Sequence, residues 1–284
     1  MKTIVSISAM RNFSEQARLR KKTIGLVPTM GYLHDGHVSL IEKARMTCDI
    51  VVTSIFVNPT QFAPGEDFAR YPRDIARDKK LCKAAGTTVL FTPEAESMYP
   101  EGYSTFVTVE GVSSTLEGKF RPTHFRGVTT VVAKLFLIVN PHKAFFGQKD
   151  AQQCVVIKKL ARDLNIGTEI VVAPIVRDKD GLAMSSRNIY LSSQERKQAT
   201  ILRAALLCAE SMVKKGTTKT AEVVKEISRL IKSKPTALID YVAVVHAESL
   251  AELETFKPGV PALIALAVRI GKTRLIDNTI ITIH

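Results

Sequence analysis

Residues 24–57 read IGLVPTMGYLHDGHVSLIEKARMTCDIVVTSIFV. Residues 24–28 have the composition of a buried strand, and residues 50–57 are β-branched and almost wholly apolar, which is typical of a strand in a parallel sheet. Between them, residues 36–48 have helical character. A strand, a helix and a second strand in this order predict a parallel sheet that binds its ligands at the carboxyl ends of the strands.

The same alternation continues for the rest of the first half of the chain. The N-terminus, MKTIVSISAMRNF, is expected to form a first short strand, because serines interrupt its apolar stretch and no cleavage pattern follows it. We therefore predict a Rossmann-like α/β domain over residues 1–176. Further strands are expected at residues 88–92, 106–109, 143–146 and 168–173, and helices at 73–85, 127–139 and 150–164.

The pattern changes near residue 177, after which helices and strands are segregated. Helices are expected at residues 193–214 and 220–233, and strands near 238–246, 262–269 and 274–283. Segregation of this kind predicts a smaller α+β unit with antiparallel strands. We expect it to be a separate C-terminal domain over residues 177–284.

Composition excludes several classes of protein. Hydrophobic residues make up 45% and charged residues 24% of the 284 residues, which is ordinary globular composition. The longest apolar run, residues 128–139, contains Thr129, Thr130 and Lys134, so no membrane span is expected. The 4 cysteines lie far apart and suggest neither a disulfide framework nor a zinc cluster, which favours a cytoplasmic protein.

The chain is basic, with a formal net charge of +13. Such a charge favours anionic partners, namely nucleic acid, acidic lipid or phosphorylated small molecules. The basic clusters, such as residues 18–22 and 79–83, are short and scattered, and no tryptophan is present. We therefore expect neither nucleic acid nor a membrane as a partner, and a merely solvated basic surface is also compatible with the charge.

Residues 28–37, PTMGYLHDGH, run from a strand end into a helix, where backbone N–H groups and the positive helix end converge. His34 and His37 are three apart, so they are expected on nearly the same helix face, where they could donate hydrogen bonds to phosphate. Two exposed histidines in a turn are the plain alternative. Without a further ligand the pair makes a poor zinc site, so no metal ligand is predicted in the chain.

Residues 145–153, FFGQKDAQQ, form a second junction of strand and helix. Gly147 permits close approach of a ligand to the backbone. Lys149 lies at the positive end of the following helix, which is unfavourable unless an anion lies between them. A phosphate site is therefore favoured over a solvated lysine.

Two further segments carry polar groups that suit a binding site. Asn58 and Gln61, in SIFVNPTQF (residues 54–62), follow a strand, although a simple turn would also explain them. Residues 184–188, MSSRN, place two hydroxyls and a guanidinium in the segment that joins the two domains. These groups could clamp a polyphosphate, and helix capping by serine is the alternative.

Together these segments resemble the pantoate–β-alanine ligase family of the nucleotidyltransferase superfamily. PTMGYLHDGH resembles the family's HIGH-type motif, with Asp35 where Glu is common, and FVNPTQF, GQKDAQQ and MSSRN match further motifs in order. FRPTHFRG (residues 120–127) is similar to another family segment and adds Arg121 and His124 to the candidates. Residues 63–67 form a loop in which family members vary, and they are expected to affect none of the roles that the resemblance implies.

The resemblance implies a role for each matching residue. His37, His34, Lys149 and Arg187 are implied to be catalytic, and Gln61, Gln153, Asn58 and Arg121 to bind the acid substrates. Asp150 would contact the ribose, and Met30 and Val176 would lie near adenosine. The full set of implied nucleotide-binding residues is Met30, Gly31, Tyr32, Leu33, His34, Asp35, Gly36, His37, Gly147, Gln148, Lys149, Asp150, Val176, Met184, Ser185, Ser186 and Arg187.

The resemblance also implies a reaction. ATP, with Mg²⁺, would activate pantoate as an adenylate, and β-alanine would then displace AMP to give pantothenate. It further implies a homodimer formed through the N-terminal domains. The alternatives are another small-molecule nucleotidyltransferase of the same superfamily, an RNA-binding module and an inactive scaffold. The first of these would keep the histidines but would not need Gln61 and Gln153.

Overall fold

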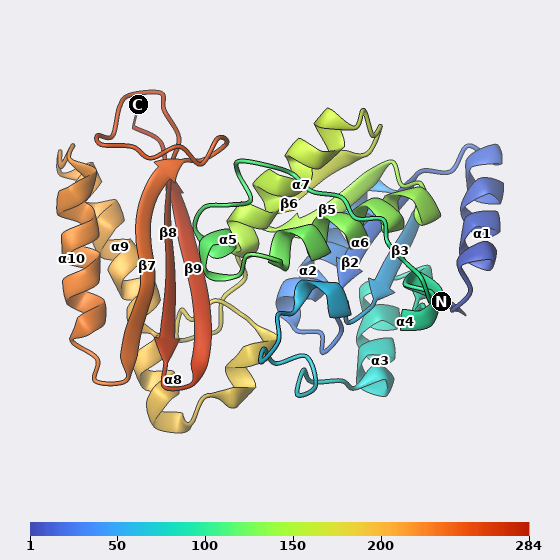
Figure 1. Ribbon diagram of the computed structural model, residues 1–284, viewed down its shortest axis with the longest axis horizontal. Coiled ribbons are helices and arrows are strands. Elements are labelled where there is room, and N and C mark those ends of the chain that lie inside the picture. Colours follow the sequence, from blue (N-terminus) through green and yellow to red (C-terminus); the bar gives the residue numbers. More distant parts are fainter. Residues whose placement is uncertain (284) are drawn as a thin grey trace.

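The computed structural model describes residues 1–283, and in them the chain forms two sheets (Figure 1). The first is a six-stranded parallel sheet in the order β1-β4-β3-β2-β5-β6, as the sequence predicts. Its strands are β1 (Lys2–Ile4), β2 (Ile24–Thr29), β3 (Ile50–Ile55), β4 (Val89–Phe91), β5 (Lys143–Gly147) and β6 (Glu169–Ala173).

Helices cover both faces of this sheet because its strands are apolar on both sides. Leu26 of β2 belongs to a buried cluster with the helices α1, α6 and α7, whereas the next residue, Val27, packs with α2 and α3. Burial of each such side chain contributes roughly 1.5–3 kcal/mol to folding. The helices are α1 (Ile7–Leu19), α2 (Asp35–Thr47), α3 (Ile75–Ala85), α4 (Ala95–Met98), α5 (Glu117–Phe120), α6 (His124–Val139) and α7 (Ala151–Asp163), with short 3₁₀ turns η1 (Pro59–Gln61) and η2 (Gln148–Asp150).

The second sheet is antiparallel and stands at the left of Figure 1, with α9 and α10 on its outer side. Its core includes Leu202, Ile227 and Leu266, which are almost completely buried. The elements of this part are η3 (Ser186–Tyr190), α8 (Ser193–Ala199), α9 (Ile201–Lys214), α10 (Thr220–Lys232), β7 (Ala237–His246), β8 (Ala262–Ile270) and β9 (Thr273–Ile281).

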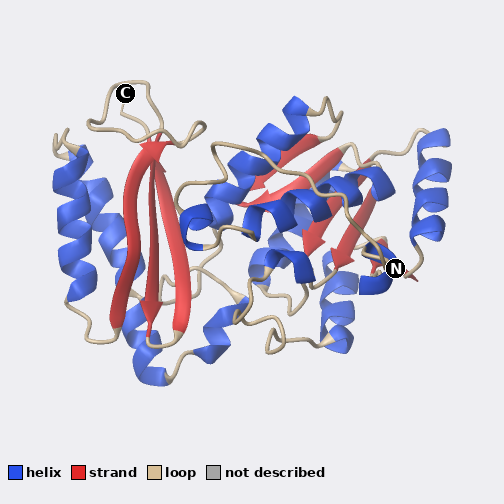
Figure 2. Ribbon diagram, viewed as in Figure 1, coloured by secondary structure: helices blue, strands red, loops and turns tan. Residues whose placement is uncertain are grey.

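Two local predictions are wrong. Residues 106–109 form no strand, because Val107 bonds instead to the hydroxyls of Thr129 and Thr130 on α6 (Figure 2). The first short strand at the N-terminus is, by contrast, confirmed as β1, which ends at Ile4, and Ser6 then caps α1 by accepting a hydrogen bond from Ala9. The long helix expected at residues 193–214 is divided at Thr200 into α8 and α9.

The strand order places the polar segments side by side. β3 and β4 lie on one side of β2, and β5 and β6 lie on the other, so the order reverses between β2 and β5. Ligands of open parallel sheets bind at the carboxyl ends of the strands beside such a reversal. The segments that follow β2, β3, β5 and β6 all begin at this edge. Within residues 1–283, no helix is long and apolar enough to span a membrane.

Candidate active site

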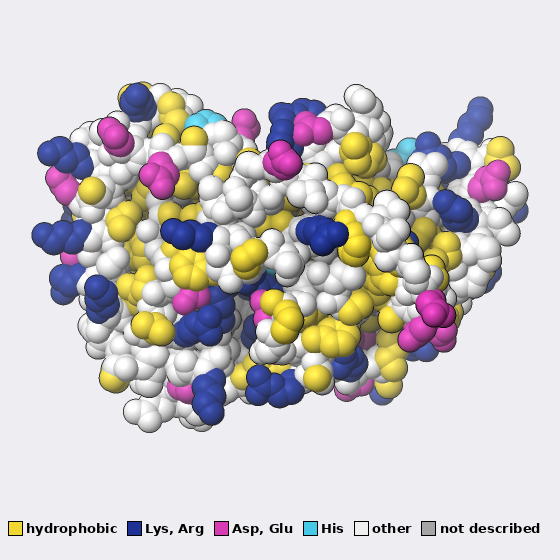
Figure 3. Space-filling model, viewed as in Figure 1, with side chains coloured by type: hydrophobic (Ala, Val, Ile, Leu, Met, Phe, Trp, Pro, Cys, Tyr) yellow, Lys and Arg dark blue, Asp and Glu magenta, His cyan; other side chains and the backbone are white. Residues whose placement is uncertain are grey.

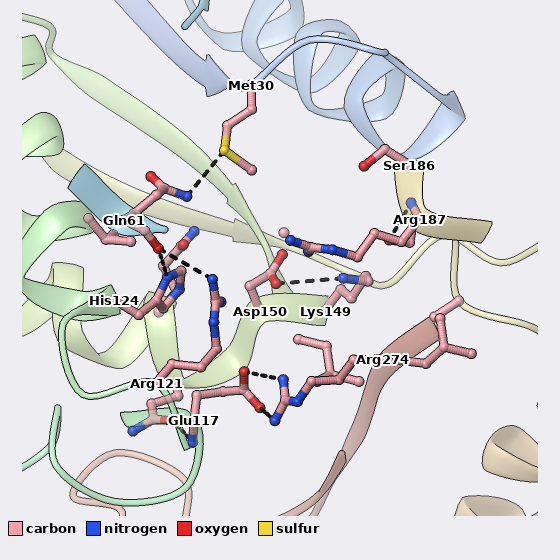
Figure 4. A pocket seen from close by; sticks show the side chains of 18 of the residues that line it. Met30, Gln61, Glu117, Arg121, His124, Lys149, Asp150, Ser186, Arg187 and Arg274 are labelled. Carbon is pink, nitrogen blue, oxygen red and sulfur yellow. Dashed lines mark hydrogen bonds and ion pairs between the residues drawn. The ribbon is translucent and has the colours of Figure 1, made fainter. Parts of the chain in front are cut away.

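A cavity of about 970 Å³ lies at this edge, between the parallel sheet and the antiparallel sheet (Figure 4). It is lined from both parts of the chain, by Met30 and Lys149 on one side and by Arg274 of β9 on the other. Most of the residues singled out from the sequence therefore share one space. Those that line it are Met30, His34, Gly36, His37, Asn58, Gln61, Arg121, His124, Gly147, Lys149, Asp150, Gln153, Val176, Met184, Ser185, Ser186 and Arg187.

Two of the other predicted residues, Tyr32 and Leu33, belong to the turn that precedes α2. The backbone N–H groups of Tyr32 and Leu33 donate to the carboxylate of Asp78 on α3, at 2.7 and 2.8 Å. This carboxylate holds the turn in which Gly31 and Tyr32 have positive φ angles of 83° and 48°. Five predicted residues are not among those lining the cavity: Gly31, Tyr32, Leu33, Asp35 and Gln148.

Asp78 was not identified from the sequence, although a signal existed. The buried positions of α3 are Asp78, Cys82 and Ala85, which have helical spacing. An acidic residue therefore interrupts the apolar face of this helix. Buried carboxylates need hydrogen-bond donors, so this position indicated a polar contact with another segment.

His34 and His37 lie as the sequence predicts, with ring centroids 4.1 Å apart. His34 is the N-cap of α2, and its Nδ1 accepts from the N–H of Gly36 at 3.2 Å. The Nδ1 of His37 accepts from the N–H of His34 at 3.3 Å. Because each Nδ1 is an acceptor, the proton of each neutral ring is on Nε2, which leaves one N–H donor on each ring.

Burial keeps these rings uncharged. Desolvation, with the nearby charge of Lys149, lowers the pKa of His34 to about 4. Desolvation also lowers the pKa of His37 well below its usual value, and His34 and Lys149 lower it further. At neutral pH both rings are therefore neutral hydrogen-bond donors, and the free positive charge near them comes from Lys149.

Lys149 and Asp150 stand at the start of α7, one beside the other (Figure 4). The ammonium of Lys149 lies 3.6 Å from the carboxylate of Asp150, whose side chain is 47% exposed. This is a loose ion pair, since close charged hydrogen bonds are shorter than about 3 Å. Lys149 can therefore turn to a bound phosphate at little cost.

Gln61 is held in place by its neighbours. The amide of Asn58, which is only 1% exposed, donates to Gln61 Oε1 and to the carbonyl of Gly127, both at 3.1 Å. Asn58 Oδ1 accepts from Tyr99 and Thr60. The polar groups of Asn58 are thus satisfied within the protein, and its structural effect is to aim the amide of Gln61.

The two arginines expected to bind substrate are already in ion pairs. Arg121 bonds to the carboxylate of Glu66 through Nε, at 2.8 Å, and through Nη2. Arg187 bonds to Asp67 through Nε and Nη2, at 2.8 and 2.9 Å. Burial opposes ionisation of both acids, but the arginines outweigh it and lower the pKa of Glu66 and of Asp67. Residues 63–67, which nothing in the sequence connected with the predicted roles, thus contact two of the predicted site residues.

The segment that joins the two parts is fastened to the cavity. The N–H of Met184 donates to the carbonyl of Val176 at 3.0 Å. Ser185 caps η3 by accepting from the N–H of Arg187, and Ser186 lies 3.1 Å from the hydroxyl of Tyr71. The capping alternative thus holds for Ser185, and Tyr71 is a contact that the sequence did not indicate.

Most of the carboxylates that line the cavity are paired with arginines. The carboxylates of Glu66, Asp67, Glu117 and Asp277 each pair with an arginine, which leaves Asp150 in the looser pair. Within residues 1–283, no group of three or more His, Cys, Asp or Glu side chains is arranged to hold a metal ion. The visible face of the molecule in Figure 3 has its lysines and arginines dispersed among acidic side chains rather than gathered in one patch.

The chain is similar to known proteins along nearly its whole length. It matches the family described as Pantoate-beta-alanine ligase over residues 2–280. The pantothenate synthetase of Acetivibrio thermocellus is 54% identical over 283 residues, which cover 100% of both chains.

Solved structures agree with this similarity. Pantothenate synthetase from Thermus thermophilus has a TM-score of 0.91 and 46% identity, covering 98% of this chain and 99% of that one. The pantoate-beta-alanine ligase of Francisella tularensis, complexed with beta-gamma ATP and beta-alanine, has a TM-score of 0.81 and 35% identity. That comparison covers 98% of this chain and 97% of the other.

Proposed function

The chain belongs to the pantoate–β-alanine ligase family, and from this premise we propose how its cavity carries out the ATP-dependent joining of pantoate to β-alanine. The chain is an enzyme of this class, and ATP is its substrate. One observation carries the assignment of roles. The imidazoles of His34 and His37, the ammonium of Lys149 and the amides of Gln61 and Gln153 all line one cavity.

In the first step, the carboxylate of pantoate attacks the α-phosphorus of ATP. A new P–O bond forms and the bond to the β-phosphate breaks, so that pantoyl adenylate and pyrophosphate result. Negative charge grows on the phosphate oxygens during this step, and fixed N–H donors and cations lower its energy. We assign that task to His37 and His34 through their Nε2–H groups, and to Lys149 and Arg187.

The nucleotide would lie along the strand ends. Adenosine is assigned to the space between Met30 and Val176, with Gly36, Gly147, Met184, Ser185 and Ser186 around the nucleotide and Asp150 at the ribose. A Cβ atom at Gly36 would lie 2.9 Å from the ring of His34, so a glycine at this position lets that ring keep its place. Lys149, whose ion pair is loose, is the residue that turns to the phosphates.

The acid-binding end of the cavity, formed by Gln61, Gln153 and Arg121, presents mainly side-chain amides to the substrates. Gln61 and Gln153 are assigned to pantoate, and Gln61 is also assigned to β-alanine. Arg121 is assigned to the carboxylate of an acid substrate. In the second step the neutral amine of β-alanine attacks the activated carbonyl. A C–N bond forms, AMP leaves with the former carboxylate oxygen, and the amine gives up a proton. No bond between enzyme and substrate is needed, because the protein contributes position and charge compensation.

Mg²⁺ is proposed to enter as the complex with ATP. The donors of the cavity fit this mode, because its carboxylates are largely committed to arginines and Mg²⁺ retains several waters when phosphates coordinate it. When bound, the ion neutralises charge on the departing pyrophosphate. No side chain of the protein is assigned as its ligand.

Three further features are proposals from the sequence. The division into domains at residues 1–176 and 177–284 is supported by three buried clusters that each lie within one part, while a fourth, smaller cluster packs Ala151 against Leu263 across the division. A homodimer through the N-terminal part is supported by apolar side chains at its surface, such as Leu137 of α6, which is 69% exposed. A cytoplasmic location agrees with the free thiols of the cysteines.

The test is release of pyrophosphate and AMP from ATP, with pantoate, β-alanine and Mg²⁺ omitted in turn. Pyrophosphate should require pantoate and Mg²⁺, and full AMP release should also require β-alanine. AMP release without either acid would indicate simple hydrolysis. The alternative, another nucleotidyltransferase of the superfamily, is not favoured by the comparisons, and it would form no pantothenate from these substrates.

A further inference from the structure

We propose that Glu117 is a positioning residue for the acid-binding end of the cavity, and that it acts by fixing this end to the antiparallel sheet. The proposal rests on the function proposed above, since Arg121 and Gln153 are assigned there to the acid substrate. Glu117 begins α5 and is 7% exposed. Its carboxylate and its backbone N–H are bonded to two other segments of the chain, and its backbone carbonyl is bonded to Arg121 at the end of α5 itself.

The carboxylate of Glu117 contacts the C-terminal part of the chain. Arg274 of β9 donates to it from Nη1 and Nη2, at 2.6 and 2.8 Å (Figure 4). The hydroxyl of Tyr241 on β7 donates to it at 2.9 Å. Arg274 is held in turn by Asp240, to which its Nε donates at 2.6 Å. The planar guanidinium therefore joins two carboxylates in a fixed geometry, which a lysine could not reproduce.

The backbone N–H of Glu117 contacts the start of α7. It donates to Gln152 Oε1 at 2.9 Å, and Gln152 Nε2 donates to the carbonyls of Val112 and Thr115. Gln152 precedes Gln153 directly. A shift of Glu117 would thus pull on the residue adjacent to one of the two amides assigned to pantoate.

The backbone carbonyl of Glu117 contacts the other side of the acid-binding end. It accepts from the N–H of Arg121 at 2.8 Å. The side chain of Arg121 reaches the carbonyl of Gln61 at 3.3 Å, and His124 Nδ1 lies 3.0 Å from the same carbonyl. Figure 4 shows Gln61, His124 and Arg121 in succession above the pair of Glu117 and Arg274.

The surroundings of Glu117 leave it little freedom. Leu116 precedes it with φ 45° and ψ −116°, a conformation that a leucine keeps only where its neighbours impose it. A Cβ atom on Gly118 would overlap the carbonyl oxygen of Ser113, so this turn lies directly against residues 111–115. Because the turn is rigid, a shift of the Glu117 side chain would be passed on to both of its ends.

The binding of pantoate and the binding of ATP should depend on Glu117 to different extents. The nucleotide end has its own contacts with the C-terminal part, through the ion pair of Arg187 with Asp67 and through Asn278, whose amide donates to the carbonyls of Gln148 and Lys149. Loss of the carboxylate of Glu117 should therefore disturb the binding of pantoate and leave the binding of ATP largely intact.

The experiment compares steady-state kinetics of Glu117→Gln with those of the unaltered enzyme. The KM for pantoate should rise about tenfold, as expected for misplacement of binding groups, while the KM for ATP changes less than about twofold. Arg274→Gln should give the same pattern. The double variant should be no worse than either single one, because both remove the same contact. Arg274→Lys should lie in between.

The control is Arg229→Gln on α10, which removes an exposed ion pair with Glu226 and should change neither constant. If Glu117→Gln does not fold, Tyr241→Phe removes one bond to the same carboxylate and should raise the KM for pantoate slightly. Equal changes in both KM values, or a lower melting temperature with unaltered kinetics, would overturn the inference. Absence of pantoate-dependent pyrophosphate release in the unaltered enzyme would instead overturn the proposed function.

Discussion

Asp67 and Arg187, 120 residues apart in the chain, form a two-point ion pair at the cavity, with N–O distances of 2.8 and 2.9 Å. The arginine that matches the family's phosphate-binding loop thus already holds an anion supplied by the protein. Glu66, the residue before Asp67, pairs with Arg121 in the same way. Substrate anions must therefore compete with two adjacent carboxylates for these two guanidinium groups.

The first prediction concerns this competition. Asp67→Asn should tighten ATP binding, lowering its Kd by up to about tenfold, because the phosphates no longer displace a carboxylate from Arg187. Isothermal titration with ATP and Mg²⁺ measures this. The control is Asp163→Asn, which removes an equal charge at the exposed end of α7. Weaker binding in Asp67→Asn would mean that the carboxylate orients Arg187 toward the nucleotide.

The second prediction concerns the histidine pair. His37→Ala removes an Nε2–H donor and should lower kcat by about 100-fold, as loss of one fixed donor to a developing oxyanion does. Circular dichroism should show an intact fold. His246→Gln, at the end of β7 in the C-terminal part, is the control and should keep full turnover. A nearly normal kcat for His37→Ala would remove His37 from the catalytic residues.

The third prediction concerns Lys149. Lys149→Met should raise the KM for ATP by about tenfold or more and leave the KM for β-alanine unaltered, because the lost charge faces only the phosphates. Lys158→Met, on the exposed face of the same helix, controls for loss of a positive charge. Normal saturation by ATP in Lys149→Met would contradict the phosphate role.

The fourth prediction concerns the contact between α6 and η1. A Cβ atom on Gly127 would overlap the carbonyl oxygen of Thr60 and would lie 2.6 Å from Gln61 Cα. Gly127→Ala should therefore lower the free energy of unfolding by about 2 kcal/mol and raise the KM for pantoate, since Gln61 must move. Urea unfolding and steady-state kinetics measure the two effects. Gly167→Ala, which meets no atom within 4 Å, should change neither.

The fifth prediction concerns pH. Burial lowers the pKa of His34 and of His124 to about 4 and lowers that of His37 as well. The unfolded chain therefore binds more protons than the folded one below the usual histidine pKa of about 6.5, and stability falls with falling pH. The free energy of unfolding should be constant above about pH 7 and should decrease steadily toward about pH 5. His124→Gln should reduce the slope, whereas an unaltered slope would show that His124 does not carry this dependence.

Much of the fold followed from the sequence because it depends on local patterns. The apolar strands at residues 24–28 and 50–57 and the helix between them needed no long-range information, since burial on both faces makes a strand apolar throughout. The proximity of His34 and His37 at the start of α2 also needed no long-range information, because the two residues are three apart in the chain. The limits of the domains and the individual roles of the site residues stay predictions.

Other features depended on partners far away in the chain. Residues 106–109 have a strand-like composition, yet their backbone bonds to hydroxyls of α6 instead of a neighbouring strand. Asn58, expected to bind substrate, has its polar groups satisfied by Gln61, Gly127, Thr60 and Tyr99. A polar side chain does not reveal in the sequence which partner satisfies it.

The sequence by itself determined the parallel sheet, the antiparallel C-terminal part and the group of residues that gather at the strand ends. Only the tertiary structure decided that Arg121 and Arg187 are paired with acids, that Asp78 holds the turn before α2, and that Glu117 joins the two parts of the chain. The periodicity of apolar residues is set by each element's own geometry, so it can be read locally. The pairing of charges depends on which segments the completed fold brings within about 4 Å, and separation along the chain carries no record of that.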